Sequence, residues 1–498
     1  MKKIIAILMA VAVLLSLCSC KGNEDPETES TTLSDEAGEK YSEIQTKLVY
    51  SKTDSMNPFE AESTVNIRLM TLIYEGLFSL DASYTPKPAV AKSCAAGASV
   101  LNVTLDSSVK FSDGSAVSVS DVIYSFNLAK ESPAYSARLA NFESVTSSNK
   151  STLIFNLSKP DVYAQNCLTF PIIKEQSDEE FPTGSGRYKV VNRNGVYVLE
   201  KNAHKKGFRP EITVIELLEI KSSDDMLSSL EIGNTCFSFD DLSDGEYSRV
   251  NASTVDVLMN NVVYLGINSN NEILASPDFR AAVNACIEKN DIANSAFQGH
   301  AKAASSPFNP DWSVIAGKLT VAEGDSAKAA ELIAKSAVDL TGKTFTLLVN
   351  ADNGFKKEAA NLIASQLLSA GILVEVRALP YESYIEAVEN EEFDFYIGEI
   401  RLTPDMNISA LFSGGSCSYG VSGDADVQSI LRYEQLLAGE CEIMDFINTF
   451  NTEMPFIPLC YRSATVSYTN SLDYGNVPCC DSDVYSNIEK WKILSVKE

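Results

Sequence analysis

Histidine is almost absent from this chain, in which only His204 and His300 occur among 498 residues. The two are far apart in the sequence and form no H-E-x-x-H motif. Because protein zinc and nickel sites are built largely from histidine and cysteine, we expect no such metal site and no cofactor. The chain also lacks the G-x-S-x-G segment of many hydrolases, which need a nucleophile beside a base. The sequence therefore argues against an enzyme.

Positively charged residues are also in deficit. Lys and Arg number 40 against 67 Asp and Glu, which gives a formal net charge of −27 at pH 7. Nucleic-acid binding depends on Lys and Arg that neutralise phosphates, so we exclude DNA and RNA as partners. With 45% hydrophobic and 21% charged residues, the composition is that of a folded globular protein. The length allows about three domains.

Long hydrophobic runs are missing except near the N-terminus, where two lysines precede an apolar run at 4–17. This run is shorter than the ~20 residues of a membrane-spanning helix and has the length found in export signals. It ends in Leu17-Cys18-Ser19-Cys20, which resembles a bacterial lipobox. The resemblance implies that residues 1–19 are removed and that Cys20 carries a lipid anchor. A buried helix with incidental cysteines is the alternative, but it leaves the two lysines unexplained.

Residues 21–44 form a polar, acidic stretch with almost no large apolar side chains. Such a segment cannot repay the entropy lost on ordering, so we expect a flexible tether. Together with the lipobox, this predicts an extracytoplasmic protein that is anchored to the cell membrane, at the cell surface or at the periplasmic face.

Nine cysteines follow Cys20, and an odd number cannot all pair within one chain. None of them forms a C-x-x-C motif. Cys286 and Cys460 stand singly in apolar surroundings, where a free cysteine behaves as a small buried hydrophobe. The adjacent Cys479 and Cys480 favour a reduced or strained pair over a redox site. The sequence leaves the redox state of all nine open.

The first half of the chain has the pattern of a mixed, hairpin-rich region. Ser120 is expected to cap a helix that has Asp121 in its first turn, and Asn194-Gly195 predicts a type I′ turn in a hairpin at 188–202. The other expected elements are a strand from 47 that ends at an Asn-Pro turn, a helix at 65–78, and strands at 100–105, 152–157 and 212–220.

The second half has a different character. A strand at 262–268 precedes a helix at 276–297, and strands and helices then alternate from 344 to 400. This β–α–β–α–β order is typical of a parallel sheet wrapped by helices, that is, of an α/β lobe. Because the two halves differ in character and lack a nucleotide fingerprint, we expect the working site in a cleft between two lobes.

Several segments of the chain share one further property, which is a resemblance to a known family. They are Asn57-Pro58-Phe59, LIYEGLFSLDASYTPKPAVAKS at 72–93, VKFSDGSAVSVSDVIYSF at 109–126, TGSGRYKV at 183–190, VYLGINSNNEILASPDFRAAVNACIEKNDI at 263–292, AKAAELI at 327–333, the region 355–376, and MPFIPL at 454–459. In this order they resemble the family 5 extracellular solute-binding proteins, the dipeptide- and oligopeptide-binding components of bacterial ABC importers. Arg187 departs from the usual T-G-P-Y ending of the fourth segment.

The resemblance implies an α/β fold of the bilobed periplasmic-binding-protein type, namely type II of the large peptide-binding class. Its two α/β lobes close about a hinge, and the first lobe carries a β-rich insert. The expected organisation is a signal peptide at 1–19, the lipidated cysteine and tether at 20–44, the first part of lobe I at 45–75, the β-rich insert at 76–178, the second part of lobe I at 179–257, lobe II at 258–466, and the C-terminal part of lobe I at 467–498. Gly184 and Gly186 are expected to allow a tight backbone path near the lobe junction.

The same resemblance points to ligand-binding residues. By position after the Asn-Pro motif, Glu62, Ser63 and Thr64 match family residues that line the cleft and pair with an extended peptide. Tyr264, near the lobe crossing, offers an amphipathic ring. Ser418 and Tyr419 lie in a glycine-rich segment, which is either a cleft loop or a plain surface loop.

Peptide-binding relatives place an aspartate after the strand at 393–400, where it receives the ammonium group of the peptide. The corresponding loop here, GEIRLTPDMNISALF, is shortened, and Glu399 and Asp405 are both candidates for that role. Arg401 lies between them. Glu399 and Arg401 could instead form an internal salt bridge, or Arg401 could receive a ligand carboxylate in bidentate fashion.

The leading hypothesis is a substrate-binding lipoprotein that captures a short peptide or another small solute and delivers it to an ABC permease and its ATPase. The membrane contact is the lipid anchor, and the family resemblance favours a monomer. Within the same fold, a sugar, an opine-like compound or a metal chelate is the alternative cargo. A sensor lipoprotein that has lost transport is a further alternative.

Overall fold

The computed structural model describes residues 43–177, 180–412, 428–475 and 479–494. Residues Ile44–Glu498 make up one compact unit. Within the described ranges, no helix combines the length and the apolar character needed to cross a membrane.

The buried apolar side chains form two large clusters, which we call core I and core II. Core I draws on residues 48–259 and 464–491. Core II draws on residues 262–461, joined by Leu80, Tyr84 and Leu242. The chain therefore passes from one core to the other near residue 260 and returns near residue 463.

Two four-stranded sheets and several short helices surround core I. In the first sheet β1 (Thr46–Ser51) pairs in parallel with β10 (Val214–Ile220), which is followed by β9 (Val196–Lys201) and β8 (Tyr188–Arg193). The second sheet is antiparallel, in the order β4 (Ala91–Ala96), β5 (Val100–Leu105), β7 (Thr152–Leu157) and β6 (Phe142–Asn149). Two small sheets are formed by β2 (Phe78–Leu80) with β3 (Pro86–Pro88) and by β18 (Leu472–Asp473) with β19 (Lys492–Ile493). The helices are α2 (Thr64–Leu69), η1 (Met70–Leu72), α3 (Val119–Glu131), η2 (Ala137–Leu139), η3 (Ala164–Cys167), α4 (Ser223–Glu231) and η6 (Ile488–Lys490).

A seven-stranded sheet carries core II. Its order is β11 (Phe237–Asp240), β17 (Phe456–Tyr468), β12 (Ser253–Ile267), β16 (Phe395–Arg401), β14 (Phe345–Asn350) and β15 (Val374–Leu379), with β13 (Ala301–Ala303) paired to β17. The helices of this part are α5 (Pro277–Cys286), α6 (Lys289–Asp291), the π-helical η4 (Ile292–Ala296), α7 (Ser326–Ser336), α8 (Gly354–Ser369), α9 (Tyr381–Glu389), η5 (Ser409–Leu411), α10 (Gln428–Ala438) and α11 (Ile443–Glu453).

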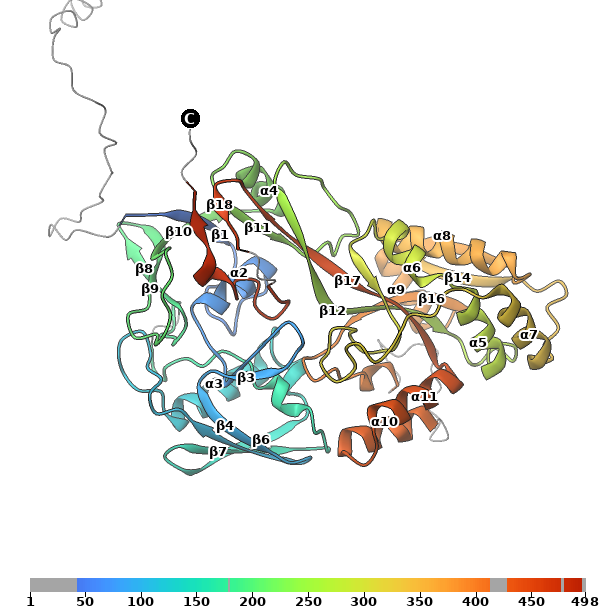
Figure 1. Cartoon of the computed structure of the whole chain (residues 1–498), viewed down its shortest axis with the longest axis horizontal. Coiled ribbons are helices and arrows are strands. Elements are labelled where there is room, and N and C mark those ends of the chain that lie inside the picture. The colour runs from blue at the N-terminus through green and yellow to red at the C-terminus, as the bar shows by residue number, and fades with distance from the viewer. Residues whose placement is uncertain (1–42, 178–179, 413–427, 476–478, 495–498) are drawn as a thin grey trace, which may run out of the picture. The chain divides into compact units, whose positions relative to one another are not determined.

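The strands β12 and β17 belong to both cores. Figure 1 shows them as two long strands side by side, and they pair antiparallel over most of their length. Val257 and Met259 of β12 lie in core I, whereas the residues from Val262 onward lie in core II. The register of the pair shifts between Leu258 and Val262. This irregularity coincides with the passage between the cores, where a hinge is expected.

The alternating pattern of the second half is confirmed. β14 pairs in parallel with both β15 and β16, and the helices α8 and α9 connect these strands. The side chains of Ala359, Ile363 and Leu367 are buried at intervals of four residues, which is the periodicity of a helix that packs one face on a sheet. Gly371, with φ of 82°, follows α8 in the left-handed conformation that glycine favours.

Two expectations about helix ends were wrong. The cap of α3 is Ser118 rather than Ser120, because Ser118 and Asp121 form a capping box in which each side chain binds the backbone N–H of the other. The helix expected at 65–78 ends by Leu72, and the chain continues into β2. Gly76 lies between η1 and β2. An added Cβ there would come within 2.7 Å of the Thr169 backbone, so the chain around Gly76 runs directly against the Thr169 segment, which leaves no room for a helix with side chains.

The helix expected at 276–297 is also interrupted. Ser276 caps α5 as the sequence predicts, but α5 ends at Cys286, and Ile287 takes an extended conformation with ψ of 117°. The rest of the expected helix is divided between α6 and η4. The hairpin of β8 and β9 is confirmed, with Asn194 and Gly195 at φ of 52° and 89°.

Gly184 and Gly186 make the close backbone approach that the sequence indicates. A Cβ added at either glycine would lie 2.3 Å from a backbone atom of Ile73. Larger residues would therefore separate this segment from the end of η1.

The described cysteines are all free thiols. They are Cys94, Cys167, Cys236, Cys286, Cys441, Cys460, Cys479 and Cys480. Most are buried, in keeping with a role as small apolar side chains. The described part of the chain contains no group of three or more His, Cys, Asp or Glu side chains placed to hold a metal ion.

Candidate ligand-binding site

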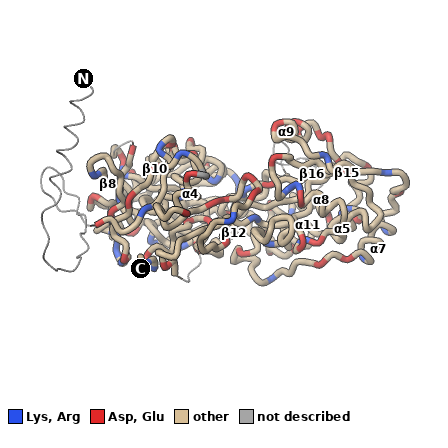
Figure 2. Tube along the Cα trace, turned by 90° about the horizontal axis from the view of Figure 1, so that it is seen from above, with Lys and Arg blue, Asp and Glu red and all other residues tan. Residues whose placement is uncertain are grey.

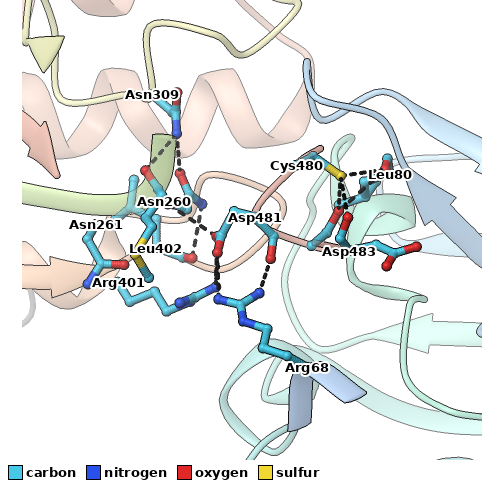
Figure 3. Close-up of polar contacts among 12 residues, drawn as sticks. Arg68, Leu80, Asn260, Asn261, Asn309, Arg401, Leu402, Cys480, Asp481 and Asp483 are labelled. Carbon is cyan, nitrogen blue, oxygen red and sulfur yellow. Dashed lines mark hydrogen bonds and ion pairs between the residues drawn. The ribbon is translucent and has the colours of Figure 1, made fainter. Parts of the chain in front are cut away.

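Asp481 is the centre of a buried polar cluster at the junction of the two cores (Figure 3). Arg68 of α2 donates from Nη2 to Oδ1 at 2.7 Å and from Nη1 to the Asp481 carbonyl. Arg401, at the end of β16, donates from Nη2 to both carboxylate oxygens at 2.9 and 2.7 Å. The backbone N–H of Asn260 in β12 donates to Oδ2 at 3.3 Å. One carboxylate therefore links a helix of core I to two strands of the core II sheet.

The electrostatics of Asp481 follow from these contacts. Burial acts to raise its pKa, but the charges of Arg401 and Arg68 outweigh burial and hold the pKa well below its usual range. The carboxylate is therefore ionised throughout the physiological range and is neutralised by two guanidinium groups.

A third arginine fixes the same C-terminal segment. Arg187 donates from Nη2 to Asp483 Oδ2 and from Nη1 to the Tyr485 carbonyl, each at 2.7 Å. It also donates to the carbonyl of Thr71, next to α2. Arg187 is the residue by which the T-G-S-G-R-Y segment departs from the family pattern, and in this chain it holds the C-terminal segment against η1.

Glu399 is engaged within the protein rather than open to a ligand. It forms ion pairs with Lys356 at 2.8 Å and with Arg462 at 2.9 Å, and the Asn261 side-chain amide donates to it at 2.8 Å. Burial acts to raise its pKa, but Lys356 and Arg462 outweigh that effect and lower it to about 2. The suggested salt bridge between Glu399 and Arg401 is not formed, because each side chain pairs with other residues.

Asp405 is also buried, at 5% exposure, and it accepts a hydrogen bond from the Thr403 hydroxyl. The side chain of Asp161, from the segment after β7, is 2% exposed, and its Oδ2 has no hydrogen-bond partner. Burial and the neighbouring Asp405 raise the pKa of Asp161 to about 8. Two carboxyl groups, one from each side of the junction, thus lie together in a buried site in which both cannot readily be charged.

Direct contacts between the two sides surround this acid pair. The N–H of Val162 donates to the Leu437 carbonyl of α10 at 2.9 Å. The side-chain amide of Asn166 donates to the Pro404 carbonyl at 3.2 Å, and the ring of Tyr163 meets the edge of Trp312 at a centroid distance of 4.9 Å. In this structure the segment after β7 therefore contacts the core II region along the stretch that contains Asp161.

Arg401 is the exposed member of the three charged candidates. Its side chain is 45% exposed, and its hydrogen bonds to Asp481 use only Nη2. Of Glu399, Arg401 and Asp405, it is thus the side chain that is accessible to a solute.

The other predicted ligand residues differ in their placement. Ser63 is the N-cap of α2 and accepts the N–H of Asn66 at 3.3 Å, while its hydroxyl donates to Asp54 at 2.5 Å. Its neighbours Glu62 and Thr64 are exposed. The assignment of Glu62, Ser63 and Thr64 as ligand contacts stays a prediction.

Tyr264, whose amphipathic ring was a candidate ligand contact near the lobe crossing, is a core residue and is not accessible to a solute in this structure. Its side chain is 3% exposed and lies in core II against Tyr396 and Phe456. The hydroxyl accepts a hydrogen bond from the hydroxyl of Tyr396 at 3.2 Å. The neighbouring strand β16 has Gly398 opposite Tyr264, which leaves room for the ring.

Three predicted residues lie outside the described part of the chain. They are Ser418, Tyr419 and the lipidation site Cys20.

A small cavity of about 40 Å³ adjoins the Asp481 cluster. Its lining includes Asp81, Tyr84, Leu258, Cys480 and Asp481. A single water needs about 10–15 Å³ by the same kind of measure, so this space suits a few waters and not a peptide.

Sequence reasoning missed Arg68, Asp481 and Asp161 as parts of the junction. Arg68 and Asp481 are 413 positions apart, so no local spacing connects them. For Arg68 the one usable signal was that it is a charged residue in a largely apolar segment, which indicates a buried partner without naming it.

The family description "Bacterial extracellular solute-binding proteins, family 5 Middle" matches residues 85–418. The chain belongs to this family. This solute-binding protein is 21% identical to the oligopeptide-binding protein AppA of Bacillus subtilis (strain 168) over 429 residues, which cover 78% of each chain. It is 24% identical to the glutathione-binding protein GsiB of Pectobacterium atrosepticum over 403 residues, covering 74% of this chain and 77% of that one.

Among solved structures, the ABC transporter substrate-binding protein CtaP of Listeria monocytogenes superposes with a TM-score of 0.70 at 18% identity. The match covers 90% of this solute-binding protein and 99% of CtaP. The fold expectation is thereby confirmed: the chain has the two-lobed α/β fold of type II binding proteins. As the sequence resemblance implied, the chain is a bacterial extracellular solute-binding protein of family 5.

Proposed function

We propose that this protein captures short peptides between its two lobes and delivers them to the membrane permease of an ABC importer. The observation that carries the proposal is the junction between the cores, where a solvent-accessible Arg401 lies beside a buried ion cluster. Polar groups that converge at a domain boundary are the usual setting of a small-molecule site. The relatives named for oligopeptides and glutathione make peptides the first class to test.

The predicted ligand residues that the structure leaves accessible are Glu62, Thr64 and Arg401. Asp405 and Glu399 would need to leave their present partners before either could receive an ammonium group. We therefore rank Arg401 first among the candidate ligand contacts, and the solute group it suits is a carboxylate.

A sugar, an opine-like compound or a metal chelate is the alternative cargo, and a sensor role without transport is the alternative use. A thermal-shift screen of the mature chain with Cys20→Ser separates these cargoes. The libraries are di- to pentapeptides, sugars, opine-like compounds and nickel chelates. A ligand at 100 times its Kd adds about 2.7 kcal/mol to the unfolding free energy. Stabilisation by sugars or chelates alone would overturn the peptide assignment.

We further propose that Cys20 is acylated and that the mature protein is anchored to the membrane as a monomer. The support is the lipobox resemblance at 17–20 and the acidic tether that follows it. Labelling of cells with an alkyne fatty acid should mark the wild-type protein and not Cys20→Ser. Cys18→Ser, the matched control, should keep its label. Equal labelling of both variants would contradict acylation at Cys20.

A further inference from the structure

The acid pair of Asp161 and Asp405 joins the two sides of the junction. Asp161 belongs to the side of core I, because its N–H donates at 2.6 Å to the carbonyl of Ala98, between β4 and β5. Asp405 belongs to the side of core II, because it directly precedes Met406, which is buried in that core. The two carboxyl groups are within hydrogen-bond reach of each other. A change in their charge therefore acts directly on the contact between the two sides.

Backbone contacts next to each aspartate hold the pair in place. The N–H of Val162, the residue after the first aspartate, donates to the Leu437 carbonyl of α10 at 2.9 Å. The side-chain amide of Asn166 donates at 3.2 Å to the carbonyl of Pro404, the residue before the second aspartate. Both bonds cross the junction. Repulsion between two charged carboxylates at this position would therefore push directly against the contacts that join the two sides.

The hydrogen bonds of the pair leave one place for a proton. Asp161 Oδ1 accepts the N–H of Tyr163 at 2.8 Å, whereas its buried Oδ2 has no hydrogen-bond partner. Asp405 Oδ1 accepts a hydrogen bond from the Thr403 hydroxyl. An ionised carboxylate is an acceptor only, so one of the two groups must carry a proton to donate to the other. Such a proton satisfies the unpartnered oxygen and removes one of two like charges from a buried site.

The other titratable side chains around the pair come from the segment after β7, from η3, from α10 and from the turn before α11, and burial raises the pKa of each. They are Tyr163, Cys167, Tyr433 and Cys441. All four are thus neutral in the physiological range. The charged groups nearby are Glu442, which acts on Tyr163, and Arg138, which acts on Cys167. In the described part of the chain, neither is among the groups that shift the pKa of Asp161, so the protons of the pair itself set its charge.

We propose that Asp161 and Asp405 form a proton-dependent latch, in which one proton shared by the two carboxyl groups holds the lobes together and its loss drives them apart. In the separated form both aspartates face water and are charged near neutral pH. Closure therefore takes up about one proton, and the latch weakens as the pH rises towards the pKa of about 8 of Asp161 in the closed form. A solute that binds the closed form takes up the same proton on binding, because linkage is reciprocal. This last step rests on the proposed function, whereas the latch itself does not.

The first test needs no solute and uses the full mature chain with Cys20→Ser. Hydrogen exchange gives the protection factor of the Val162 amide, whose bond to the Leu437 carbonyl reports a closed junction. We expect this factor to be at least tenfold lower at pH 8.5 than at pH 5.5. Asp161→Asn should have the same factor at both pH values, because its amide donates to Asp405 without titrating. Amides of β14, inside the core II sheet, should stay protected throughout.

Two further variants separate the latch from a general effect of charge. Asp405→Asn should also remove the pH dependence, and it takes the place of Asp161→Asn if that variant fails to fold. Asp278→Asn is the control and should keep the pH dependence of the wild type, because its exposed carboxylate pairs with Lys335 between α5 and α7 at 2.8 Å. A wild-type protection factor that is equal at both pH values would overturn the latch. A pH dependence that persists in Asp161→Asn would overturn it as well.

The second test measures the coupling to a solute. Trialanine is titrated calorimetrically at pH 6 in buffers of different ionisation enthalpy, which gives the number of protons taken up on binding. Neither terminus of the peptide titrates at this pH. We expect an uptake of about one proton by the wild type and of about none by Asp161→Asn. Release of a proton by the wild type would overturn the coupling, because the acid pair would then exchange its proton for the ammonium group of the peptide.

The two tests fail independently. No binding of trialanine, together with the expected hydrogen exchange, would support the latch and contradict the peptide assignment. Binding of trialanine without pH-dependent exchange at Val162 would keep the peptide function and overturn the latch.

Discussion

Arg401 and Asp481 are joined across 80 positions of the chain by one nitrogen, since Nη2 of Arg401 lies 2.9 Å from Oδ1 and 2.7 Å from Oδ2 of Asp481. Arg68 reaches the same carboxylate from α2 at 2.7 Å (Figure 3). Because Arg401 ends a strand of core II whereas Arg68 and Asp481 belong to segments of core I, this carboxylate ties the cores together beside the strands that pass between them.

Removal of the Asp481 charge should destabilise the protein strongly. In Asp481→Asn the buried guanidinium of Arg68 loses its counter-charge, and breaking a buried pair in this way costs about 3–5 kcal/mol. Urea denaturation of the mature chain measures the loss. The matched control is Asp278→Asn, whose exposed pair with Lys335 at 2.8 Å should contribute less than about 1 kcal/mol. Similar small losses in both variants would contradict the role given to Asp481.

The acid pair of Asp161 and Asp405 predicts a pH dependence of stability. Burial and Asp405 raise the pKa of Asp161 to about 8 in the folded protein, compared with about 4 in an unfolded chain. The folded state therefore holds this proton more tightly, and the stability that it contributes at low pH is lost as the pH rises from about 4 to 8.

Asp161→Asn should remove that dependence. The asparagine keeps an acceptor for the N–H of Tyr163 and is neutral at every pH. We expect the variant to be more stable than the wild type at pH 8, by about 1–3 kcal/mol, with a smaller difference at pH 5. Thermal unfolding across pH 5–9 tests this. A variant that is less stable than the wild type at pH 8 would show that Asp161 is held charged by a favourable contact.

The capping of α3 gives a matched pair of serine variants. Ser118→Ala removes the side chain that accepts the N–H of Asp121 and should destabilise the protein by about 1 kcal/mol. Ser120→Ala, two positions later, should have less than half this effect, because Ser120 already lies within the helix. Urea midpoints of the two variants decide between Ser118 and Ser120 as the cap.

The burial of Tyr264 predicts that its hydroxyl is dispensable for solute binding. Tyr264→Phe loses the hydrogen bond from Tyr396 in core II, so the unfolding free energy should fall by about 0.5–1.5 kcal/mol. Its affinity for trialanine should stay within about twofold of the wild type, in contrast with Arg401→Gln. A tenfold loss of affinity in Tyr264→Phe would show that the Tyr264 hydroxyl contributes to solute binding after all.

The acidic residues of this protein are found in part on exposed helix faces. Figure 2 shows Asp and Glu along α9, where Glu382, Glu386 and Glu389 are exposed. The net charge of −27 is thus carried by surface residues of this kind. At the junction, by contrast, two guanidinium groups bind the buried carboxylate of Asp481, which a composition averaged over the chain does not reveal.

Local patterns were enough for much of the fold. The Asn194-Gly195 turn, the parallel pairing of β14 with its neighbours and the start of α5 at Ser276 all follow from residues close together in sequence. Some of the differences arose where a neighbour distant in sequence decides the outcome. The early end of the helix before Gly76 depends on the backbone of Thr169, and the burial of Tyr264 depends on the space left by Gly398 in the next strand.

For the site, the sequence alone established the family resemblance, the class of function and the three charged candidates at 399, 401 and 405, because motifs and periodicity are properties of short segments. Only the tertiary structure decided which of the three is accessible. Glu399 is neutralised by Lys356 and Arg462, Asp405 is buried beside Asp161, and Arg401 keeps part of its guanidinium in solvent. The physical reason is that the state of a charge depends on its partners and its burial, and these come from chain segments far apart in sequence.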